Sequence, residues 1–133
     1  MKKLTLIVLL SCSFATPASW SADFNKGVTA YQAGNYKAAL AEWRPLAQAG
    51  NARAQNFLGF MYDNGEGVLE DDLEAVKWYR LAAEQGNPKA QYGLGVMFAN
   101  GEGVTQSNVY AHMWWNIAAS NGDRQANENK AVI

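Results

Sequence analysis

A repeat with a period of 36 residues constrains the fold of this chain more than any other feature of its sequence. Residues 52–87 align with residues 88–123 without a gap, and 15 of the 36 paired positions are identical. A less regular unit precedes them; it opens with Phe24, Gly27 and Tyr31 and has a shorter central loop. A period of this length is typical of a solenoid, in which each unit is one supersecondary element stacked on the next.

The period also divides the chain. We expect helical units at about residues 23–51, 52–87 and 88–123, within a repeat domain of residues 22–126. Residues 124–133 indicate the start of a C-terminal capping helix, which is either truncated or complete in a short gene.

Hydrophobic periodicity predicts two helices in each full unit. Apolar residues recur in the first helix at i, i+4, i+7 and i+8, namely at Ala54, Leu58, Met61 and Tyr62. The glycines of segment 64–67 predict a tight turn, because glycine adopts positive φ without strain. The second helix is expected to start near Asp71, with a capping box to Glu74, and to end at Gly86. No segment after the N-terminus alternates as a strand does. We therefore expect an all-α fold, an α/α superhelix of tandem helix-turn-helix repeats.

Two further features indicate how the helices pack. Gly59 and Gly95 lie inside first helices, where glycine costs about 1 kcal/mol relative to alanine. Their recurrence at one repeat position predicts that the neighbouring helix passes too close for a methyl group. The largest side chains lie midway along the second helices, and we expect much of the stability to come from their burial. They are Trp43, Trp78, Tyr79, Trp114 and Trp115.

The order of these residues resembles the consensus of Sel1-like repeats, relatives of the tetratricopeptide repeats with a longer loop between the helices. The resemblance runs from Ala54-Gln55 to Gly86, and again from Ala90-Gln91 to Gly122. With the first unit, which is closer to an ordinary tetratricopeptide repeat, it covers about residues 24–126. The resemblance implies a right-handed superhelix whose inner face binds peptides or proteins, often in the bacterial envelope.

A protein-interaction module or adaptor, and not an enzyme, is the function that this resemblance implies. One secreted branch of the family, to which β-lactam binding or hydrolysis has been attributed, carries paired cysteines in each repeat. This chain has a single cysteine, Cys12, and so departs from that branch. An envelope enzyme acting on cell-wall or β-lactam amides stays open as the alternative function.

The N-terminus has the layout of a secretory signal peptide. Lys2 and Lys3 precede a short apolar run, and small residues follow it. The run is too short to span a bilayer, for which about 20 apolar residues are needed. We expect residues 1–21 to be removed, with cleavage between residues 18 and 22, and the mature bacterial protein to be periplasmic or secreted. Residues 9–12 also resemble a lipobox, so a lipoprotein anchored through Cys12 is an alternative.

Charge and composition exclude several classes of partner. The chain has 11 basic and 12 acidic residues, and removal of the two N-terminal lysines brings the net charge to about −3. No basic cluster is present that would attract nucleic acid or anionic lipid. No other segment is apolar enough to enter a membrane. We therefore expect a protein or peptide partner and a monomeric mature chain.

No residue pattern predicts a catalytic, cofactor or metal site. The single histidine, His112, has no partners that would form a catalytic triad or a zinc site. The acidic residues of segment 70–74 lack the spacing of a calcium loop and suit a helix start. The glycine-rich segments 64–67 and 100–103 lack the strand and the lysine of a phosphate loop. Glu66 and Glu102 recur at the repeat period, which indicates an architectural role and not paired catalytic carboxylates.

The candidate partner-binding residues lie beside the apolar stripe of the first helices. In tetratricopeptide-like stacks these helices line the concave face, where a residue need not serve the hairpin core. The residues left for that face are Arg53, Asn56, Phe60, Asp63 and Asn64 and, one period later, Lys89, Tyr92, Val96, Ala99 and Asn100. Basic, amide and aromatic side chains together suit an extended peptide. The alternative is a solvated helix surface without a partner.

Overall fold

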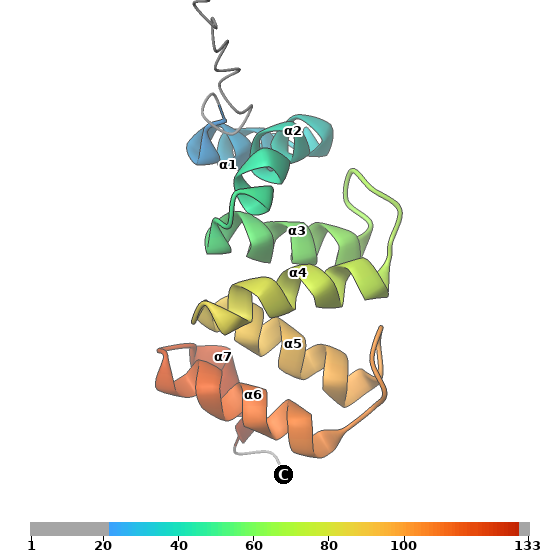
Figure 1. Ribbon diagram of the computed structural model, residues 1–133, viewed down its shortest axis with the longest axis vertical. Helices are drawn as coiled ribbons and strands as arrows, with labels where there is room; N and C mark the ends of the chain where they lie inside the picture. Colours follow the sequence, from blue (N-terminus) through green and yellow to red (C-terminus); the bar gives the residue numbers. More distant parts are fainter. Residues whose placement is uncertain (1–21, 131–133) are drawn as a thin grey trace, which may run out of the picture.

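The computed structural model describes residues 22–130 as a stack of helical hairpins (Figure 1). The seven helices of this segment are α1 (Phe24–Gln32), α2 (Tyr36–Gln48), α3 (Ala52–Asn64), α4 (Asp72–Glu84), α5 (Pro88–Asn100), α6 (Asn108–Ser120) and α7 (Arg124–Lys130). No strand occurs between residues 22 and 130, so the predicted all-α array of hairpins is confirmed. The expected signal peptide at residues 1–21, with Cys12, lies outside the described residues, as do residues 131–133.

Side chains at recurring positions start the helices. Asn51 and Asn87 cap α3 and α5, because each side-chain oxygen accepts the backbone N–H three residues on, at 3.0 and 2.9 Å. Asp71 caps α4 in the same way. The predicted capping box is wrong in its second half, because the carboxylate of Glu74 accepts the indole N–H of Trp78 at 3.2 Å instead. Trp78 lies one helical turn further on, so this contact holds Glu74 away from the helix start.

The loops after α3 and α5 repeat one conformation. Gly65 and Gly101 end these helices with φ of 68° and 71°, in the left-handed region that favours glycine. The predicted tight turn is therefore confirmed. Both loops leave the same side of the stack (Figure 1). Gly103 lies against the backbone of Asp72 and Leu73, so the second loop also contacts the preceding hairpin.

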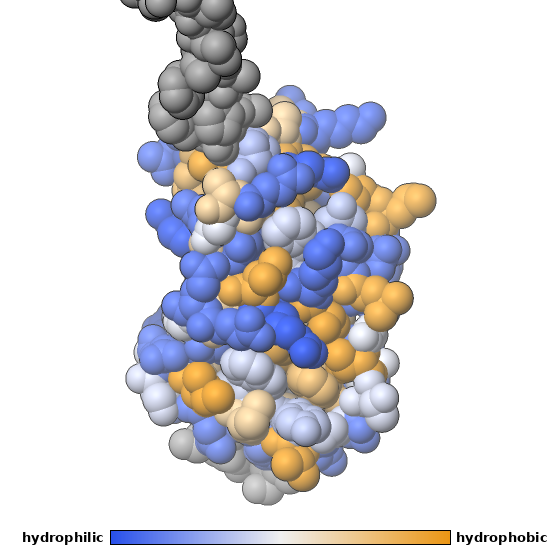
Figure 2. Space-filling view, in the orientation of Figure 1, coloured by the Kyte–Doolittle hydropathy of each residue, from blue (hydrophilic) through white to orange (hydrophobic). Residues whose placement is uncertain are grey.

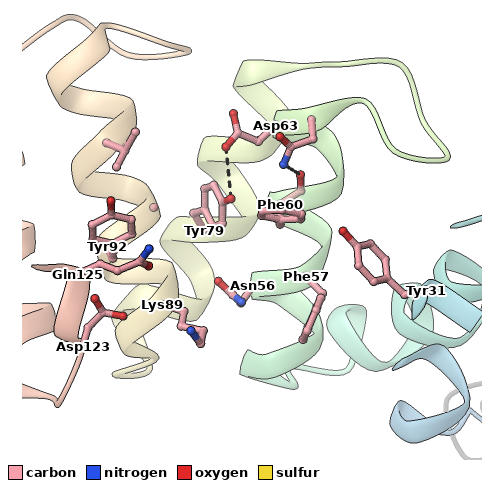
Figure 3. A pocket seen from close by; sticks show the side chains of 13 residues that line it. Tyr31, Asn56, Phe57, Phe60, Asp63, Tyr79, Lys89, Tyr92, Asp123 and Gln125 are labelled. Atoms are coloured by element: carbon pink, nitrogen blue, oxygen red, sulfur yellow. Dashed lines mark hydrogen bonds between the residues drawn. The ribbon is translucent and has the colours of Figure 1, made fainter. Parts of the chain in front are cut away.

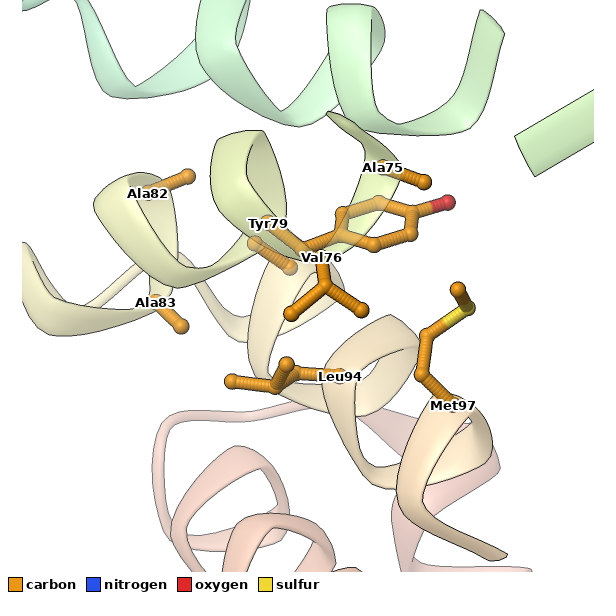
Figure 4. Packing of buried hydrophobic residues seen from close by; sticks show 8 residues of the cluster. Ala75, Val76, Tyr79, Ala82, Ala83, Leu94 and Met97 are labelled. Carbon is orange, nitrogen blue, oxygen red and sulfur yellow. The ribbon is translucent and has the colours of Figure 1, made fainter. Parts of the chain in front are cut away.

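The hydrophobic core lies mainly between successive hairpins. One cluster joins α2 to α3, through residues such as Leu40 and Leu58. The next joins α4 to α5 and contains Tyr79 and Leu94 (Figure 4). A smaller cluster joins α6 to α7, where Ala126 is fully buried. Each second helix thus buries its apolar face against the first helix of the next unit, as expected of a solenoid.

Within each hairpin, a glycine of the first helix lies against an aromatic ring of the second. A Cβ at Gly59 would lie 2.6 Å from the Tyr79 ring, and one at Gly95 would lie 2.5 Å from the Trp115 ring. Gly27 faces Trp43 in the first unit in the same way. The predicted close approach is confirmed, but a ring and not the helix backbone supplies most of it.

These three rings are also buried in the core. Trp43 is 0% exposed, Tyr79 4% and Trp115 7%. Trp78 and Trp114, which were expected to be buried as well, are only partly buried and pack against the edges of the core clusters. Each of these two tryptophans directly precedes the buried ring of its helix in the sequence. Neighbouring residues of a helix point in different directions, so the tryptophan side chain lies beside the contact between the helices and not within it.

A buried glutamine links three helices at each of two positions. The Gln55 amide N–H donates to the carbonyl oxygen of Ala47 at 3.1 Å, and its own oxygen accepts from Gln85 at 2.7 Å. One period later, Gln91 makes the corresponding bonds to Ala83 and Asn121, at 3.0 and 2.9 Å. Each glutamine therefore adds a second donor to a carbonyl at the end of the preceding second helix, beside the backbone N–H of Gly50 or Gly86.

The surface is mixed in polarity. On the face shown in Figure 2, apolar patches are separated by hydrophilic side chains. Among the described residues, the most exposed large apolar side chains are Leu69, Val109 and Leu73, at 91%, 78% and 72%. Between residues 22 and 130, none of the helices combines the length and the hydropathy needed to cross a membrane.

The contact between Gly95 and Trp115 can be tested by adding one methyl group. Helix propensity alone predicts that Gly95→Ala stabilises the protein by up to about 1 kcal/mol. We expect a net loss of about 1–3 kcal/mol, because the Trp115 ring is buried and cannot move aside freely. Urea denaturation followed by circular dichroism measures the difference. In the Trp115→Leu background the same change should cost less, and an equal cost in both backgrounds would contradict the role of the ring.

Candidate functional site

A groove with a volume of about 570 Å³ runs across the first helices. Helices α1, α3 and α5 each contribute side chains to it, together with the start of α7 (Figure 3). Aromatic rings, amides and charged groups line it, namely Tyr31, Asn56, Phe57, Phe60, Asp63, Asn64, Tyr79, Lys89, Tyr92, Gly93, Val96, Asp123 and Gln125.

Most of the residues predicted to bind a partner meet in this groove. Those that line it are Asn56, Phe60, Asp63, Asn64, Lys89, Tyr92 and Val96. Arg53 does not line it, because its guanidinium lies over the Phe24 ring, 4.1 Å from the ring centroid. Asn100 is also elsewhere and donates to the Glu102 carboxylate at 3.5 Å. Ala99 packs against the cluster between α6 and α7.

Other lining residues were missed for identifiable reasons. Tyr31 comes from the irregular first unit, whose shorter loop hides its alignment with the later units. Gln125 stands one period after Lys89 and could have been found by extending the repeat into α7. Phe57 was not predicted, because the sequence does not show that it packs toward the preceding hairpin. Its ring centroid lies 4.3 Å from that of Trp43.

A single difference between the units shapes the middle of the groove. The position of Phe57 is occupied one period later by Gly93. Phe57 covers the Trp43 ring, whereas Gly93 has no side chain to cover Tyr79, whose ring contributes directly to the lining. A Cβ at Gly93 would lie 3.0 Å from the Tyr79 ring. The groove is therefore open between α3 and α5, where a regular repeat would have placed a ring.

Charged side chains lie at both edges of the groove, Asp63 at one and Lys89 with Asp123 at the other (Figure 3). Lys89 belongs to the first turn of α5 and Asp63 to the last turn of α3, and Figure 3 shows them at opposite ends of the lining. The hydroxyl of Tyr79 donates to the Asp63 carboxylate at 3.4 Å. Burial, followed by the negative charge of Glu102, raises the pKa of Asp63 above its usual range.

Both groove tyrosines next to carboxylates are held in the neutral form. Burial, and then the nearby Asp63 charge, raises the pKa of Tyr79 well above its usual value. Tyr31 donates to the Glu66 carboxylate at 2.6 Å, and burial together with this bond raises the Tyr31 pKa. These hydroxyls therefore act as hydrogen-bond donors and not as bases at neutral pH.

The residues considered for other chemistry have structural contacts. His112 lies edge-on to the Trp115 ring, with centroids 5.7 Å apart. In segment 70–74, Asp71 caps α4 and Glu74 contacts Trp78 and Lys77. Glu66 joins the second unit to Tyr31 of the first, as an architectural residue would. Within the described part of the chain, no group of three or more histidine, cysteine or acidic residues is placed to hold a metal ion.

The repeats themselves identify the family. The Sel1 repeat model matches residues 52–87 and 88–123. The chain belongs to the Sel1 repeat family. Sel1 repeat proteins typically mediate protein–protein interactions, and their fold is generally a scaffold without enzymatic activity. No curated protein matches the chain in sequence.

Solved structures of other Sel1-type proteins have the same fold. A Sel1 repeat protein from Oxalobacter formigenes is 33% identical, with a TM-score of 0.77 over 81% of this chain and 44% of that one. The protective antigen c5321 of uropathogenic Escherichia coli strains is 37% identical, with a TM-score of 0.72 over 77% of this chain and 23% of that one. Cysteine-rich protein B of Helicobacter pylori, 21% identical, has a TM-score of 0.62 over 79% of this chain and 90% of that one. This chain spans less than half the length of the first two structures.

The raised pKa of Asp63 predicts a pH-dependent effect on stability. Because the folded state disfavours the ionised carboxylate, its cost is present above the folded pKa and disappears below the ordinary carboxylate pKa. Asp63→Asn should therefore raise the free energy of unfolding at neutral pH. The gain should be under about 1 kcal/mol, because the carboxylate is partly exposed and solvent screens it. Urea melts at neutral and acidic pH measure it, and a gain that grows as the pH falls would contradict the assignment.

Proposed function

We propose that this protein is an exported interaction module that binds an extended segment of another protein in the groove across α1, α3 and α5. The groove itself carries the proposal, because it combines exposed aromatic surface with amides and charges on a rigid helical scaffold. Membership of a family that mediates protein–protein interactions supports the same function.

The groove lining suits a peptide backbone. The amides of Asn56, Asn64 and Gln125 can each donate to a carbonyl and accept from an N–H. Phe60 is 41% exposed and offers an apolar surface between them. A groove of this length contacts only a short segment, so we expect an affinity near micromolar, equivalent to about −8 kcal/mol.

Export is the second part of the proposal. The basic start, short apolar run and small residues of segment 1–21 have the layout of a secretory signal peptide. The mature chain would then lack cysteine and would depend on its packed core, and not on disulfides, in an oxidising compartment. We place the mature protein in the bacterial periplasm or outside the cell.

Binding in the groove can be tested with a random peptide display library. Wild-type protein should enrich peptides that bind with near-micromolar affinity, and Asn56→Ala combined with Phe60→Ala should weaken them at least about tenfold, or 1.4 kcal/mol. Phe60 is preferable to Tyr92, because the Tyr92 ring packs against the cluster between α6 and α7. Anisotropy of labelled peptides measures the affinities.

A matched double variant on another face provides the control. Leu81→Ala combined with Glu84→Ala changes one exposed apolar and one exposed polar residue on α4, away from the groove. It should bind the selected peptides as the wild type does. Peptides that lose affinity to the control and keep it for the groove variant would move the site to the outer face.

Export makes a separate prediction about the N-terminus. In a bacterial host, the full chain should be recovered from the envelope or the medium with a new N-terminus at one of residues 19–23. Deletion of segment 1–21 should retain it in the cytoplasm. Cell fractionation and intact-mass measurement decide the outcome. An unprocessed chain in the cytoplasm would refute export without affecting the groove.

A further inference from the structure

The Asp63 carboxylate in the groove lacks a cationic partner. Among the described side chains, the only ion pair joins Lys77 to Glu74, on the outer part of α4. The groove lysine, Lys89, lies at the opposite edge (Figure 3). The one side-chain hydrogen bond that Asp63 receives is the long bond from Tyr79, at 3.4 Å. One weak hydrogen bond does not offset the free-energy cost of removing a carboxylate from water.

Other acidic groups make the same edge more negative. Glu102, Asp72 and Glu70 all act on Asp63 in the direction that raises its pKa. Glu66 lies on this side of the groove as well, because it accepts the hydroxyl of Tyr31, a lining residue. A ligand group with a positive charge is therefore favoured at this edge and one with a negative charge is disfavoured.

The surface that leads to Asp63 is aromatic. In Figure 3 the Phe60 and Tyr79 rings lie directly below the carboxylate. Phe60 is 41% exposed and its ring centroid is 6.5 Å from that of Tyr31. Aromatic faces attract cations and also pack well against the methylene groups of lysine and arginine side chains.

We propose that the partner segment inserts a lysine or arginine side chain at this edge, with its stem on Phe60 and its cationic head on the Asp63 carboxylate. This inference rests on the proposed function and adds the chemistry of the residue that the groove recognises. The aromatic approach and the Asp63 carboxylate together select a long side chain with a terminal cation. A bare metal ion is not favoured there, because it needs several ligands that the described residues do not bring together.

Only one of the two full repeat units has the residues that would recognise the basic side chain. One period after Asp63 stands Ala99, and one period after Phe60 stands Val96. The corresponding place on α5 therefore has neither the carboxylate nor the ring. A basic residue of the partner should occupy one fixed position, and its neighbours should be read by weaker contacts.

The experiment uses amide-capped peptide pools that differ only in their central residue. That residue is arginine, lysine, norleucine or glutamate, and the flanking positions are the same mixture of alanine, leucine, asparagine and serine in every pool. Anisotropy with the full mature chain should show the arginine or lysine pool binding at least about tenfold more tightly than the norleucine pool, with the glutamate pool weakest. Asp63→Asn should abolish this preference and leave the norleucine pool unchanged.

Glu84→Gln is the matched control, because it removes one negative charge from an exposed residue outside the groove. It should keep the preference for a basic residue, which excludes an effect of net charge alone. Equal binding of all four pools, with loss in the Asn56→Ala, Phe60→Ala variant, would overturn this inference and leave groove binding intact. A basic preference that persists in Asp63→Asn would overturn it as well. No binding by any pool, with no peptides enriched from the display library, would count against the proposed function itself.

Discussion

In each hairpin of this protein, an aromatic ring of the second helix lies against a glycine of the first. The glycine is unfavourable for an isolated helix, by about 1 kcal/mol relative to alanine. It is required here because a Cβ at Gly59 or Gly95 would fall within 2.6 Å of a buried ring. The ring in turn reaches the next hairpin, as Trp43 does when it contacts Phe57. One contact therefore sets both the separation of the two helices and the surface on which the next unit packs.

The stack depends on these interfaces because a single hairpin cannot bury its own apolar face. The clusters that contain Leu58 and Leu94 each lie between one unit and the next. Gln55 and Gln91 add a polar link at the same interfaces, because each donates to a carbonyl near the end of the preceding helix. Apolar burial gives most of the stability in such an arrangement, and the glutamines fix the register, since a shifted helix would leave a buried amide without partners. The α7 helix starts in the same register, with Asp123 as its cap and Ala126 buried, one period after Asn87 and Ala90.

The sequence predicted the parts of the fold that recur with its period. Helix pairs, left-handed glycines at the turns and the helical glycines all follow from local patterns that occur twice. Contacts between units were harder to predict, because no local sequence pattern identifies which residues pair. The periodicity marks Gln55 as special, yet nothing local says that it bonds to Ala47 and Gln85. The candidate groove shows the same division. Residues beside the helical stripe were found, whereas Tyr31 depends on how an irregular unit stacks. Arg53 was predicted to line the groove but does not, because its guanidinium lies over the Phe24 ring.

The groove is informative because several of its residues differ from one repeat to the next. Positions that serve the stack keep their residue types from unit to unit, as the buried alanines and leucines do. Along the groove, Phe57 becomes Gly93, Phe60 becomes Val96 and Asp63 becomes Ala99. None of these differences is needed for helix pairing, and Asp63 carries a desolvation cost that an alanine would avoid. Asp63 receives only the long hydrogen bond from Tyr79, and helix stacking alone does not explain why a charged group is held in this partly buried site. Binding of a complementary group gives a physical reason for it, because a cation placed against the carboxylate would offset that cost only when the partner is present.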